Sequence, residues 1–593
     1  MIKVSDYIAK KIASFGIEHI FMVTGGGAMH LNDSFAHNSP FRVTYNHHEQ
    51  ACAIAAEGLY RATGKVGAVN VTTGPGGLNT LTGLMGQWTD SIPVFYVSGQ
   101  VKYETTIMSC RSTGLRQLGD QEVDIISIVQ PLTKYAVSIS DPLVIRKELE
   151  KAWFLAMSGR KGPVWLDIPM NVQGATIEED TLSPYMASNI EPLNIDVSWV
   201  VDLLLKARSP VIVAGHGLRL SGTIDHLFRI LDNIPIPVVV TFNGFDIVPD
   251  MHPCFCGRIG TIGTRGGNFA LQNADLILFL GTRNNIRQTS YNWENYAKNA
   301  VTIAVDIDEA ELLKPTFRPT HAINVDLAVF MPQLVERTSK VPLLDFSKWL
   351  GWAKERNHRY PCTLPEHYSE KERINPYPFM KLFTRVLAPD SQVVCGNGSA
   401  CVVMFQAGEV KQGQRIFWNS GCAAMGYDLP AAIGAAVGSD HDVWCIAGDG
   451  SLQMNIQELA TVKKNNLPIK VVYLNNGGYA SIRQTQMNYF GAQYGCGETN
   501  GLGFPEMRTL AAAYGLPYFV SSNIDQLSDD MQRVLSEHGP LVWEIHLRLD
   551  YSFEPKLSSR RLPDGRMVSP SLEDMYPFLS EDEMRTNRFS RTE

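Results

Sequence analysis

The sequence predicts an α/β protein with three doubly wound parallel-sheet domains and an irregular C-terminal tail. Its 593 residues are too many for one hydrophobic core and suggest about three or four domains. Three segments alternate apolar runs that end in Gly or Pro with helical patterns, which is typical of parallel α/β layers. The composition, 45% hydrophobic and 19% charged, is that of an ordinary globular protein.

The first domain is expected at residues 1–174. Three apolar runs indicate its strands: "KVGAVNVTTGPGG" (65–77), "IPVFYVSGQ" (92–100) and "GPVWLDIP" (162–169). The polar, Pro-containing stretch at 178–194 that follows is typical of a linker between domains.

The second domain is expected at 195–341, with strands in "PVIVAGHG", "IPVVVTFNG", "ADLILFLG" and "AVTIAVDID". A second linker is expected at 356–378. The third domain, at 375–549, contains the strand and turn units "SQVVCGNGSA", "DVWCIAGDG", "LPIKVVYLNN" and "GPLVWEIHL". The tail, 550–593, is too polar for a core and too aromatic for a free linker, so it should pack over the body. Because domains one and three are similar in size and layout, we expect two related domains that enclose a shared site.

Charge and apolar patterning exclude several classes of function. A net charge of −8 over this length leaves no basic face for nucleic acid or an anionic membrane. The chain contains no run of 18 apolar residues and begins without a signal-peptide pattern, so we expect a soluble, cytoplasmic protein. The ten Cys lack zinc-site spacing and are expected to be buried free thiols.

The stretch "CIAGDGSLQMNIQE" (445–458) places one carboxylate, Asp449, between two glycines at the end of an apolar run. An Asp in a tight turn has an ordinary explanation, since it can accept hydrogen bonds from nearby backbone N–H groups and cap the next helix. Asn476 follows 27 residues later (476 − 449), after a helix pattern and another strand. This span lets both residues lie at the carboxyl edge of one parallel sheet. With the carbonyl of Gly478 they would form the partial oxygen cage that Mg²⁺ prefers.

The combination of "GDGSLQMNIQEL" with "LNN" resembles the binding motif for thiamine diphosphate (ThDP) in the ThDP-dependent decarboxylase and carboligase superfamily. "FWNSGCAAMGYDLPAAIGAAVG" and "YNHHEQACAIAAEGLYRATGK" resemble signatures of its acetolactate synthase-like branch. The resemblance implies that Asp449, Asn476 and the Gly478 carbonyl hold Mg²⁺. It also implies that Met425 is the apolar wedge that bends the cofactor. The diphosphate and the rest of the cofactor would lie against Gly398, Ser399, Ala400, Gly448, Gly450, Ser451, Tyr479 and Ala480.

In "YNHHEQACAIAAEG", Glu49 precedes an almost wholly apolar helix pattern. From the residues alone, a helix first-turn carboxylate favoured by the helix dipole is an equally good explanation. The resemblance implies that Glu49 shares a proton with the pyrimidine ring of ThDP, and that Gln121, Gly26 and His48 lie near the reacting centre. It further implies a homodimer or homotetramer with active sites between subunits.

The second domain resembles the flavin-binding middle domain of the acetolactate synthase branch. Asp306 and Asp308 follow a strand, where a carboxylate can accept hydrogen bonds from an adenosine ribose. The resemblance predicts FAD in a structural role, and the alternatives are ADP alone or no cofactor. The residues expected to line the dinucleotide are Gly257, Gly281, Thr282 and Arg283.

Two departures from the family occur where the second substrate should bind. Thr485 and Asp120 stand at positions where the synthase branch has Trp and Phe. This change favours a polar acceptor, whereas Arg287 matches an arginine that binds the acceptor carboxylate. The tail resembles ThDP enzymes of cell-surface sugar pathways, some of which act on a nucleotide-linked keto sugar.

The function predicted from these features is a ThDP- and Mg²⁺-dependent carboligase of the acetolactate synthase type. It would decarboxylate a 2-oxo acid such as pyruvate and transfer the hydroxyethyl unit to a carbonyl acceptor. Three alternatives stay open: a simple 2-oxo acid decarboxylase that releases an aldehyde, an FAD-dependent 2-oxo acid oxidase, and a non-catalytic homologue.

Overall fold

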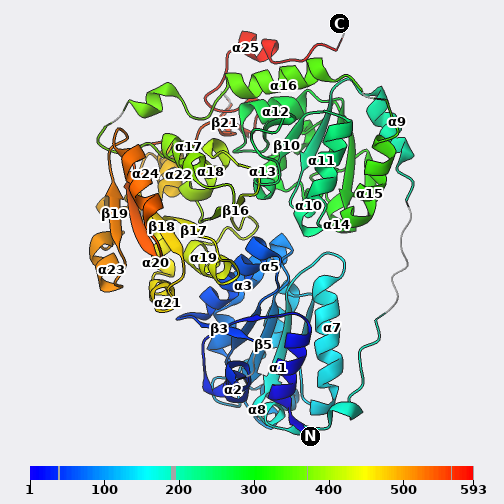
Figure 1. The fold of residues 1–593 in the computed structure, drawn as a ribbon, viewed down its shortest axis with the longest axis vertical. Coiled ribbons are helices and arrows are strands. Elements are labelled where there is room, and N and C mark those ends of the chain that lie inside the picture. The colour runs from blue at the N-terminus through cyan, green and yellow to red at the C-terminus, as the bar shows by residue number, and fades with distance from the viewer. Residues whose placement is uncertain (38–39, 188–194, 343, 370, 562–563, 592–593) are drawn as a thin grey trace.

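The computed structural model describes residues 1–37, 40–187, 195–342, 344–369, 371–561 and 564–591. Within these residues the chain forms three six-stranded sheets in which all paired strands run parallel. Helices flank each sheet, and the three domains surround a common centre (Figure 1). The predicted fold class is confirmed. Part of the predicted linker at 178–194, namely 188–194, lies outside the described residues.

The sheet of the first domain has the order β3-β2-β4-β5-β7-β6. A short antiparallel pair, β1 (Ile2–Lys3) and β8 (Thr176–Ile177), lies beside it. The six strands are β2 (His19–Met22), β3 (Arg42–Tyr45), β4 (Ala68–Val71), β5 (Phe95–Gln100), β6 (Tyr135–Ser138) and β7 (Val164–Pro169). The main helices are α1 (Val4–Ser14), α2 (Met29–His37), α3 (Glu49–Thr63), α5 (Leu81–Asp90) and α7 (Ile145–Met157).

The sheet of the middle domain has the order β11-β10-β9-β12-β13-β14, so the chain starts in the middle and winds outward in both directions. This order places a topological switch point between β9 and β12, where open parallel sheets bind ligands. The strands are β9 (Pro210–Ala214), β10 (Val238–Val240), β11 (Phe255–Arg258), β12 (Leu276–Leu280), β13 (Val301–Asp306) and β14 (His321–Asn324). The main helices are α9 (Ser198–Lys206), α11 (Ile224–Asn233), α12 (Arg265–Gln272) and α15 (Leu327–Thr338).

A further helix, α16 (Ser347–Arg359), follows the expected end of the middle domain at residue 341. Its Trp349 is buried and donates a hydrogen bond from Nε1 to the Pro210 carbonyl at 2.8 Å. The predicted linker at 356–378 is therefore only partly correct, because it contains the end of this helix and the beginning of α17 (Pro376–Val386).

The sheet of the third domain has the order β16-β15-β17-β18-β20-β19, the same order as the first when strands are counted along the chain. This equivalence agrees with the predicted relation between the two domains. The strands are β15 (Gln392–Cys395), β16 (Arg415–Phe417), β17 (Val443–Gly448), β18 (Ile469–Asn475), β19 (Tyr518–Ser521) and β20 (Leu541–His546). The helices beside them are α18 (Ser399–Ala407), α19 (Asp428–Val437), α20 (Asp449–Met454), α21 (Glu458–Lys464), α22 (Ala480–Phe490), α23 (Met507–Ala513) and α24 (Leu527–Ser536).

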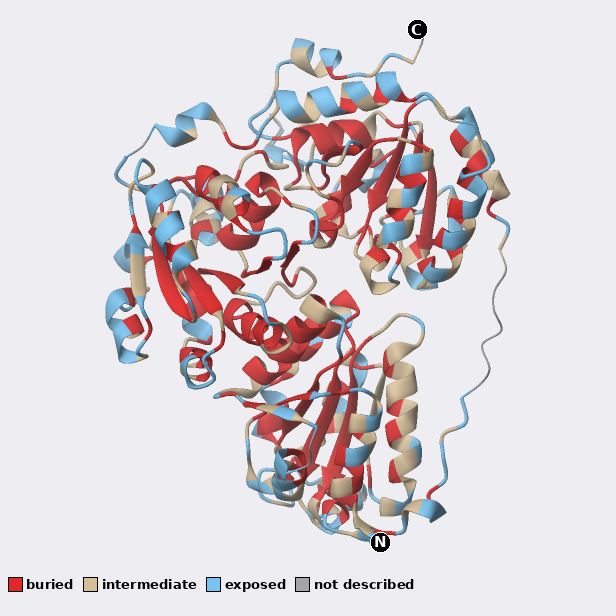
Figure 2. Ribbon diagram, in the orientation of Figure 1, coloured by how far each residue is buried: buried red, intermediate tan, exposed pale blue. Residues whose placement is uncertain are grey.

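The first and third domains are joined by α3 and α19, which pack with almost no side chain between their backbones. A Cβ on Gly58 would overlap the Ala431 carbonyl, and a Cβ on Gly434 would overlap the Ala55 carbonyl. Buried residues of both domains form one continuous hydrophobic cluster across this contact. Figure 2 shows the buried strands and these central helices in red. Only small residues allow such an approach, so the contact fixes the two domains closely against each other.

The C-terminal tail packs over the body of the protein, as predicted, and its later part lies on the middle domain. Arg265 and Asn268 of α12 donate hydrogen bonds to the carbonyls of Met575 and Leu572, each at 3.1 Å. Met575 and Leu572 are themselves buried. The tail contains β21 (Arg560–Arg561), β22 (Met567–Val568) and α25 (Glu581–Thr586), and runs across the top of the molecule in Figure 1.

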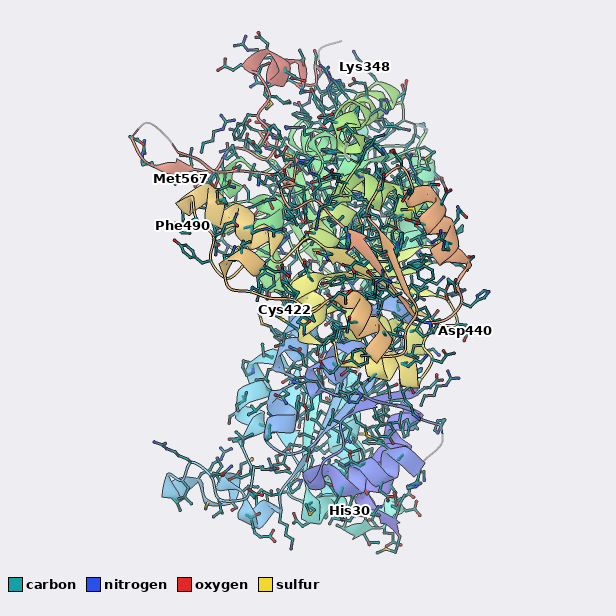
Figure 3. The ribbon with its side chains drawn as sticks, turned by 90° about the vertical axis from the view of Figure 1, so that its left-hand side faces the viewer. His30, Lys348, Cys422, Asp440, Phe490 and Met567 are labelled. Carbon is teal, nitrogen blue, oxygen red and sulfur yellow. The ribbon has the colours of Figure 1, made fainter. Side chains whose placement is uncertain are left out.

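All ten cysteines are free thiols, as predicted, but only eight are buried, because Cys110 and Cys422 are partly exposed. Cys422 lies at the junction between the first domain and the rest of the molecule (Figure 3). In the described part of the chain, no helix is both long enough and apolar enough to cross a membrane.

Candidate functional site

The carboxyl edge of the third sheet brings the predicted Mg²⁺ ligands together. Strands β17 and β18 are neighbours, with Gly448 opposite Leu474, so Asp449 and Asn476 both leave the sheet at the same edge. Asp449 and Asn476 are each 3% exposed. The Gly478 N–H donates to Asp449 Oδ2 at 2.9 Å. The 27-residue spacing therefore spans one crossover between neighbouring parallel strands, as predicted, but this crossover contains two short helices, α20 and α21, where the sequence pattern predicted one.

The oxygens in this cluster fit a cation. The Asn476 amide donates from Nδ2 to hydroxyl groups at Tyr551 and Ser399, which turns its oxygen towards Asp449 Oδ1 at 3.1 Å and towards the Gly478 carbonyl. Asp449 Oδ1, the amide oxygen and the Gly478 carbonyl then face one another, while the Gly478 N–H donates to the other carboxylate oxygen, Oδ2. Without a cation the swapped amide would be favoured, because its nitrogen would donate to both oxygens. With a hard cation such as Mg²⁺ the oxygen-inward orientation is the suitable one.

Burial raises the pKa of Asp449 to about 6. A carboxylate that is kept from water and lacks a close counter-ion is expected to shift in this direction. Arg483, which the sequence analysis missed, donates to the Asn476 carbonyl at 2.6 Å and to the Gly477 carbonyl at 3.0 Å. The guanidinium thus holds the β18–α22 turn rather than neutralising the carboxylate directly.

The predicted diphosphate residues surround the same edge. Gly398 has φ = +67° and forms the N-cap of α18, and Ser399 and Ala400 begin that helix. Ser451 Oγ accepts from the Gly426 N–H at 2.9 Å. The N-termini of α18 and α20 therefore lie on either side of the oxygen cluster, a geometry that suits an anion.

Different constraints explain why the two residues beside Asp449 are glycines. The position of a Cβ on Gly448 is open space, which agrees with the close approach of a ligand. A Cβ on Gly450 would instead overlap the Tyr479 ring and lie 2.9 Å from Met425 Cε. Gly450 is thus explained by packing under Tyr479 and Met425, two residues that were predicted to touch the cofactor. Ala480, the first residue of α22, is buried behind them.

The loops at the carboxyl edge of the first sheet bring Glu49, Gly26 and Gln121 into one region. Glu49 Oε2 accepts from Asn79 Nδ2 at 2.9 Å, and Gly76 lies close to the same carboxylate. Gly74, with φ = +61°, packs against the Gln121 carbonyl, and Gln121 itself has φ = +61°. A non-glycine residue in the left-handed region stores strain, which is common at functional sites.

Gly26 and His48 have distinct surroundings at this edge. Gly25 and Gly27 pack on Thr72 and Thr73, whereas the Cβ direction of Gly26 is open. His48 caps α3, since its Nδ1 accepts from the Gln50 N–H at 3.0 Å. This contact gives His48 a structural role. Glu458, which the sequence analysis missed, joins the two domains beside this edge by accepting from Asn46 Nδ2 and the His47 N–H, each at 2.9 Å.

A second site is a cavity between the middle domain and its neighbours, with about 1160 Å³ of empty space including its open mouth. It lies at the switch point: the turn after β9 contributes His216 and Gly217, and the turn after β12 contributes Gly281, Thr282 and Arg283. The two turns pack backbone to backbone, with the Gly217 N–H donating to the Gly281 carbonyl at 3.0 Å. A ligand pocket of this size and place fits a dinucleotide.

Polar atoms without partners line this cavity. Within the described residues, both ring nitrogens of His216, the Thr282 hydroxyl and the Asn243 amide oxygen are buried and unbonded. Burial also lowers the pKa of His216 to about 3, with Arg61 adding to the effect, so the ring is neutral. Unpaired buried polar groups are costly, and a polar ligand would satisfy them. His216 could have been found from "AGHG", a glycine turn after a strand.

Three of the residues predicted to hold the dinucleotide at β12, namely Gly281, Thr282 and Arg283, line the cavity, as does Asp306. Burial raises the pKa of Asp306 to about 6. Gly257 is outside the cavity, because its Cα faces Thr264 and Asn357 in the contact with α12 and α16. Asp308 is engaged elsewhere, in an ion pair with Arg160 at 2.7 Å and as the N-cap of α14 (Glu309–Leu312).

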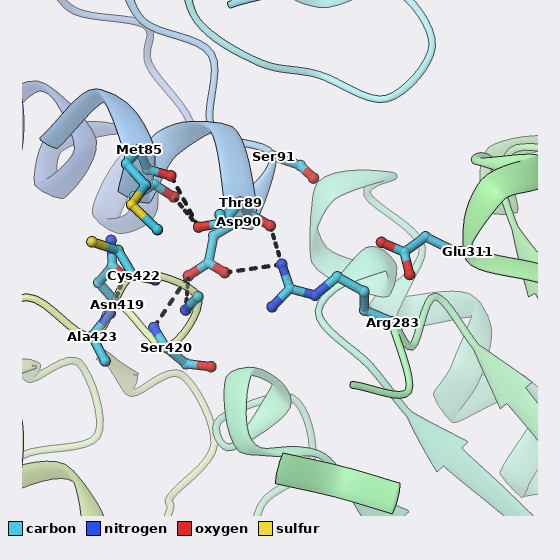
Figure 4. Close-up of polar contacts among 12 residues, drawn as sticks. Met85, Thr89, Asp90, Ser91, Arg283, Glu311, Asn419, Ser420, Cys422 and Ala423 are labelled. Carbon is cyan, nitrogen blue, oxygen red and sulfur yellow. Dashed lines mark hydrogen bonds and ion pairs between the residues drawn. The ribbon is translucent and has the colours of Figure 1, made fainter. Parts of the chain in front are cut away.

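One wall of the cavity comes from the first domain, at Thr89, Asp90 and Arg160. Figure 4 shows Asp90 between Arg283 of the middle domain and Ser420 of the third. The Ser420 N–H donates to Asp90 Oδ2 at 3.2 Å, and Arg283 approaches Asp90 Oδ1 at 3.8 Å. All three domains therefore meet at this wall, so the cavity depends on their assembly.

The predicted substrate residues are dispersed. Asp120 and Thr485 are both exposed, on the first and third domains, and Thr485 Oγ1 donates to the Ser481 carbonyl of its own helix at 2.9 Å. Arg287 lines the middle cavity with its guanidinium 5.0 Å from the Phe242 ring centroid. Within one chain these three residues do not form a single acceptor pocket.

Family models match all three domains. The model described as the N-terminal TPP (thiamine pyrophosphate, the same compound as ThDP) binding domain of thiamine pyrophosphate enzymes matches residues 2–128. The central-domain model matches 197–334, and the C-terminal TPP binding domain matches 396–545. The three matches together identify the chain as a thiamine diphosphate-dependent enzyme.

Comparison with similar proteins identifies a branch within this class of enzymes. The chain is 30% identical over 549 residues to the acetolactate synthase large subunit of Lactococcus lactis, covering 91% of this chain and 92% of that protein. It is also 30% identical to the acetolactate synthase isozyme 2 large subunit of Escherichia coli, covering 92% and 95%. The chloroplastic acetolactate synthase of Arabidopsis thaliana is 30% identical, covering 92% and 81%. The chain belongs to the acetolactate synthase-like branch of the thiamine diphosphate-dependent enzymes, and is a carboligase of that type.

Proposed function

We propose that this enzyme uses Mg²⁺ and ThDP to decarboxylate a 2-oxo acid, pyruvate first among them, and to transfer the hydroxyethyl unit to a carbonyl acceptor. The observation that carries the proposal is the group of three acceptor oxygens at Asp449, Asn476 and Gly478. These residues would hold Mg²⁺, and Gly398, Ser399 and Ser451 would hold the diphosphate beside it. When bound, ThDP supplies a thiazolium ring that accepts the electron pair released as carbon dioxide leaves.

The protein's own contribution lies in positioning and proton transfer. Tyr479 and Met425 form an apolar contact over Gly450, where they would orient the cofactor's rings. Glu49 would hold a proton at the pyrimidine ring, with Asn79 fixing its carboxylate by the 2.9 Å hydrogen bond. Gln121 would donate a hydrogen bond to oxygen at the reacting centre, from a strained backbone that only a rigid surrounding maintains.

The middle cavity would hold FAD as a structural cofactor. The unbonded nitrogens of His216 and the cradle of Gly217 and Gly281 support a dinucleotide there. Extraction of the purified protein with acid, followed by mass spectrometry, should release FAD. Release of ADP alone would show that the cavity binds only the adenosine diphosphate part of such a dinucleotide.

A homodimer or larger assembly with sites between subunits is part of the proposal. Glu49 is half-buried, and near it in the fold Tyr45 and Met29 expose 50% and 52% of their surfaces. Such apolar side chains around a catalytic carboxylate suit a covering surface. Mixing inactive Glu49→Gln and Asp449→Ala subunits should restore activity, because a mixed dimer contains one intact site. No recovery on mixing, despite exchange of subunits, would place both residues in one subunit's site.

The experiment that tests the function is product analysis. Protein loaded with ThDP and Mg²⁺ would receive pyruvate alone, pyruvate with a second 2-oxo acid, and pyruvate with a nucleotide-linked keto sugar. We expect carbon dioxide and a C–C bonded product, and the polar side chains of Asp120 and Thr485 favour the polar acceptor. Stoichiometric acetaldehyde without a condensed product would identify a simple decarboxylase. Bleaching of the flavin by pyruvate at the turnover rate would identify an oxidase.

A further inference from the structure

The C-terminal tail contributes a buried tyrosine to the oxygen cluster of the third domain. Tyr551 follows β20 by a few residues and is 7% exposed, packed beside Phe553 with their ring centroids 5.9 Å apart. Its hydroxyl lies 3.0 Å from the Asn476 amide nitrogen and is hydrogen-bonded to Ser399 Oγ. Gln484 of α22 donates to the Tyr551 carbonyl at 2.8 Å, which fixes the backbone there.

The Asn476 amide can face the cluster with either end. With Nδ2 donating to Tyr551 at 3.0 Å and to Ser399 at 3.3 Å, the amide oxygen points at Asp449 Oδ1 and the Gly478 carbonyl. In the swapped orientation the nitrogen occupies that position and the oxygen accepts from the two hydroxyls. Only the first orientation offers an oxygen to a cation, because an amide nitrogen carries no lone pair for coordination.

The hydroxyl protons show how the two orientations differ. Tyr551 and Ser399 have two O–H protons, and the hydrogen bond between them uses one. In the swapped orientation the other proton is used on the amide oxygen. In the cation-binding orientation both hydroxyl oxygens accept from the amide, so the remaining proton is available to an anion next to Ser399.

We propose that Tyr551 is a positioning residue that holds the Asn476 amide with its oxygen towards the cation, and so makes metal binding depend on the docked C-terminal tail. This inference deepens the proposed function and rests on its Mg²⁺ site. Neighbours that orient metal ligands are known to change metal affinity without touching the metal. Tyr551 thereby couples the tail, the metal and the diphosphate side of the site through one side chain.

The test compares Tyr551→Phe with Tyr377→Phe. Tyr377 is also buried, and its hydroxyl also holds the tail, by accepting from the Glu554 N–H at 2.7 Å and donating to Gln406 at 2.7 Å. Within the part of the chain that the structure describes, its hydroxyl makes no hydrogen bond with Asp449, Asn476 or Gly478. Both variants lose one buried hydroxyl that ties the tail to the third domain, but only Tyr551→Phe leaves an amide N–H of Asn476 without its partner.

The measurement is binding of Mn²⁺ by electron paramagnetic resonance at saturating ThDP, on the full-length protein. We expect the Mn²⁺ dissociation constant to rise about 10-fold or more in Tyr551→Phe and to stay within about 2-fold in Tyr377→Phe. Equal affinities in Tyr551→Phe and the wild type would overturn the inference. So would an equal loss in both variants, because tail docking alone would then explain it. Absence of Mn²⁺ binding in the wild type would instead refute the proposed Mg²⁺ site.

Thermal unfolding without metal or cofactor monitors the fold of each variant. Should Tyr551→Phe fail to fold, Ser399→Ala removes the other hydroxyl acceptor of the same amide, and a weaker Mn²⁺ affinity at saturating ThDP is again expected. An unchanged Mn²⁺ affinity in Ser399→Ala would then contradict the proposal.

Discussion

The first and third domains have the same strand order but different carboxyl edges. In the third domain this edge buries an oxygen cluster around Asp449, whereas in the first it presents the half-buried Glu49 among partly exposed loops. The shared topology therefore decides where a site forms, and the loop residues decide what it binds. In the proposed function each domain would supply half of a site: one half would hold a metal and a diphosphate, and the other would transfer a proton.

The equivalent strands β7 and β20 show the same contrast inside the core. Each buries one carboxylate, Asp167 in β7 and Glu544 in β20. Burial raises the pKa of Asp167 to about 7, despite the hydrogen bond from Ser98 at 2.6 Å. Burial also opposes ionisation of Glu544, but hydrogen bonds from His546, Asn475 and Tyr518 lower its pKa. Each carboxylate accepts hydrogen bonds from three side chains, but only Glu544 has an imidazole among them, His546, whose charge adds to its hydrogen bond. The kind of partner, together with burial, therefore sets the direction of the shift.

The largest expected effect comes from a substitution in the third-domain half of the site, the oxygen cluster around Asp449. Asp449→Ala removes the one charged oxygen of the cluster, so Mn²⁺ affinity at saturating ThDP should fall by roughly 100-fold or more, with a comparable loss of turnover. Titration calorimetry with Mn²⁺ or Mg²⁺ measures this change. An affinity close to the wild-type value would exclude Asp449 as a ligand.

The next largest effect is expected from a substitution in the first-domain half of the site, which leaves the oxygen cluster of the third domain intact. Glu49→Gln should reduce turnover by about 100- to 10,000-fold, because a general acid–base group is lost. The Mn²⁺ dissociation constant should stay unchanged, since Glu49 is not in the oxygen cluster. Weaker Mn²⁺ binding in this variant would show that the two halves are not separable.

The contact between the two domains can be tested by adding one methyl group. In Gly434→Ala the new Cβ would overlap the Ala55 carbonyl, so the free energy of unfolding should fall by about 1–3 kcal/mol. Gly351→Ala in α16 is the matched control, because nothing lies within 4 Å of its Cβ position. There the substitution should raise the free energy of unfolding by about 0.5–1 kcal/mol. Urea denaturation of both variants measures the difference.

The smallest expected effect is the pH dependence of stability caused by the two buried strand carboxylates, Asp167 and Glu544. Asp167 has a raised pKa in the folded state, so the folded protein binds its proton more tightly than the unfolded chain does, and stability falls as pH rises from about 4 to about 7. Asp167→Asn should therefore gain stability over the wild type as pH rises, by roughly 2 kcal/mol at pH 8 relative to pH 5.

Glu544 predicts the opposite dependence. Its lowered pKa contributes stability above the usual Glu range, which is lost as pH falls through the folded-state pKa. Glu544→Gln should be destabilised at pH 8, and the deficit should shrink towards acid pH. If the free energy of unfolding of Asp167→Asn and of Glu544→Gln, each relative to the wild type, changed with pH in the same direction, the contrast between the two strands would be wrong.

The sequence by itself determined the three parallel sheets and the residues at their carboxyl edges. Apolar runs that end in glycine locate strands, and the 27-residue step from Asp449 to Asn476 leaves room for one crossover between parallel strands, so both residues were predicted to meet. Local pattern also predicted the free cysteines and the packed tail.

Only the tertiary structure decided which long-range partners complete each site. Tyr551 lies 75 residues from Asn476 along the chain, and Asp90 meets Arg283 and Ser420 from two other domains. His216, in the turn after β9, was not predicted from the sequence. Gly257 was expected to line the dinucleotide, but it packs against α12 outside the cavity. Periodicity reports which face of an element is buried, but it carries no information about what lies opposite. Those contacts depend on how the three sheets pack together, to which the contacts of α3 with α19 and of the tail with α12 contribute.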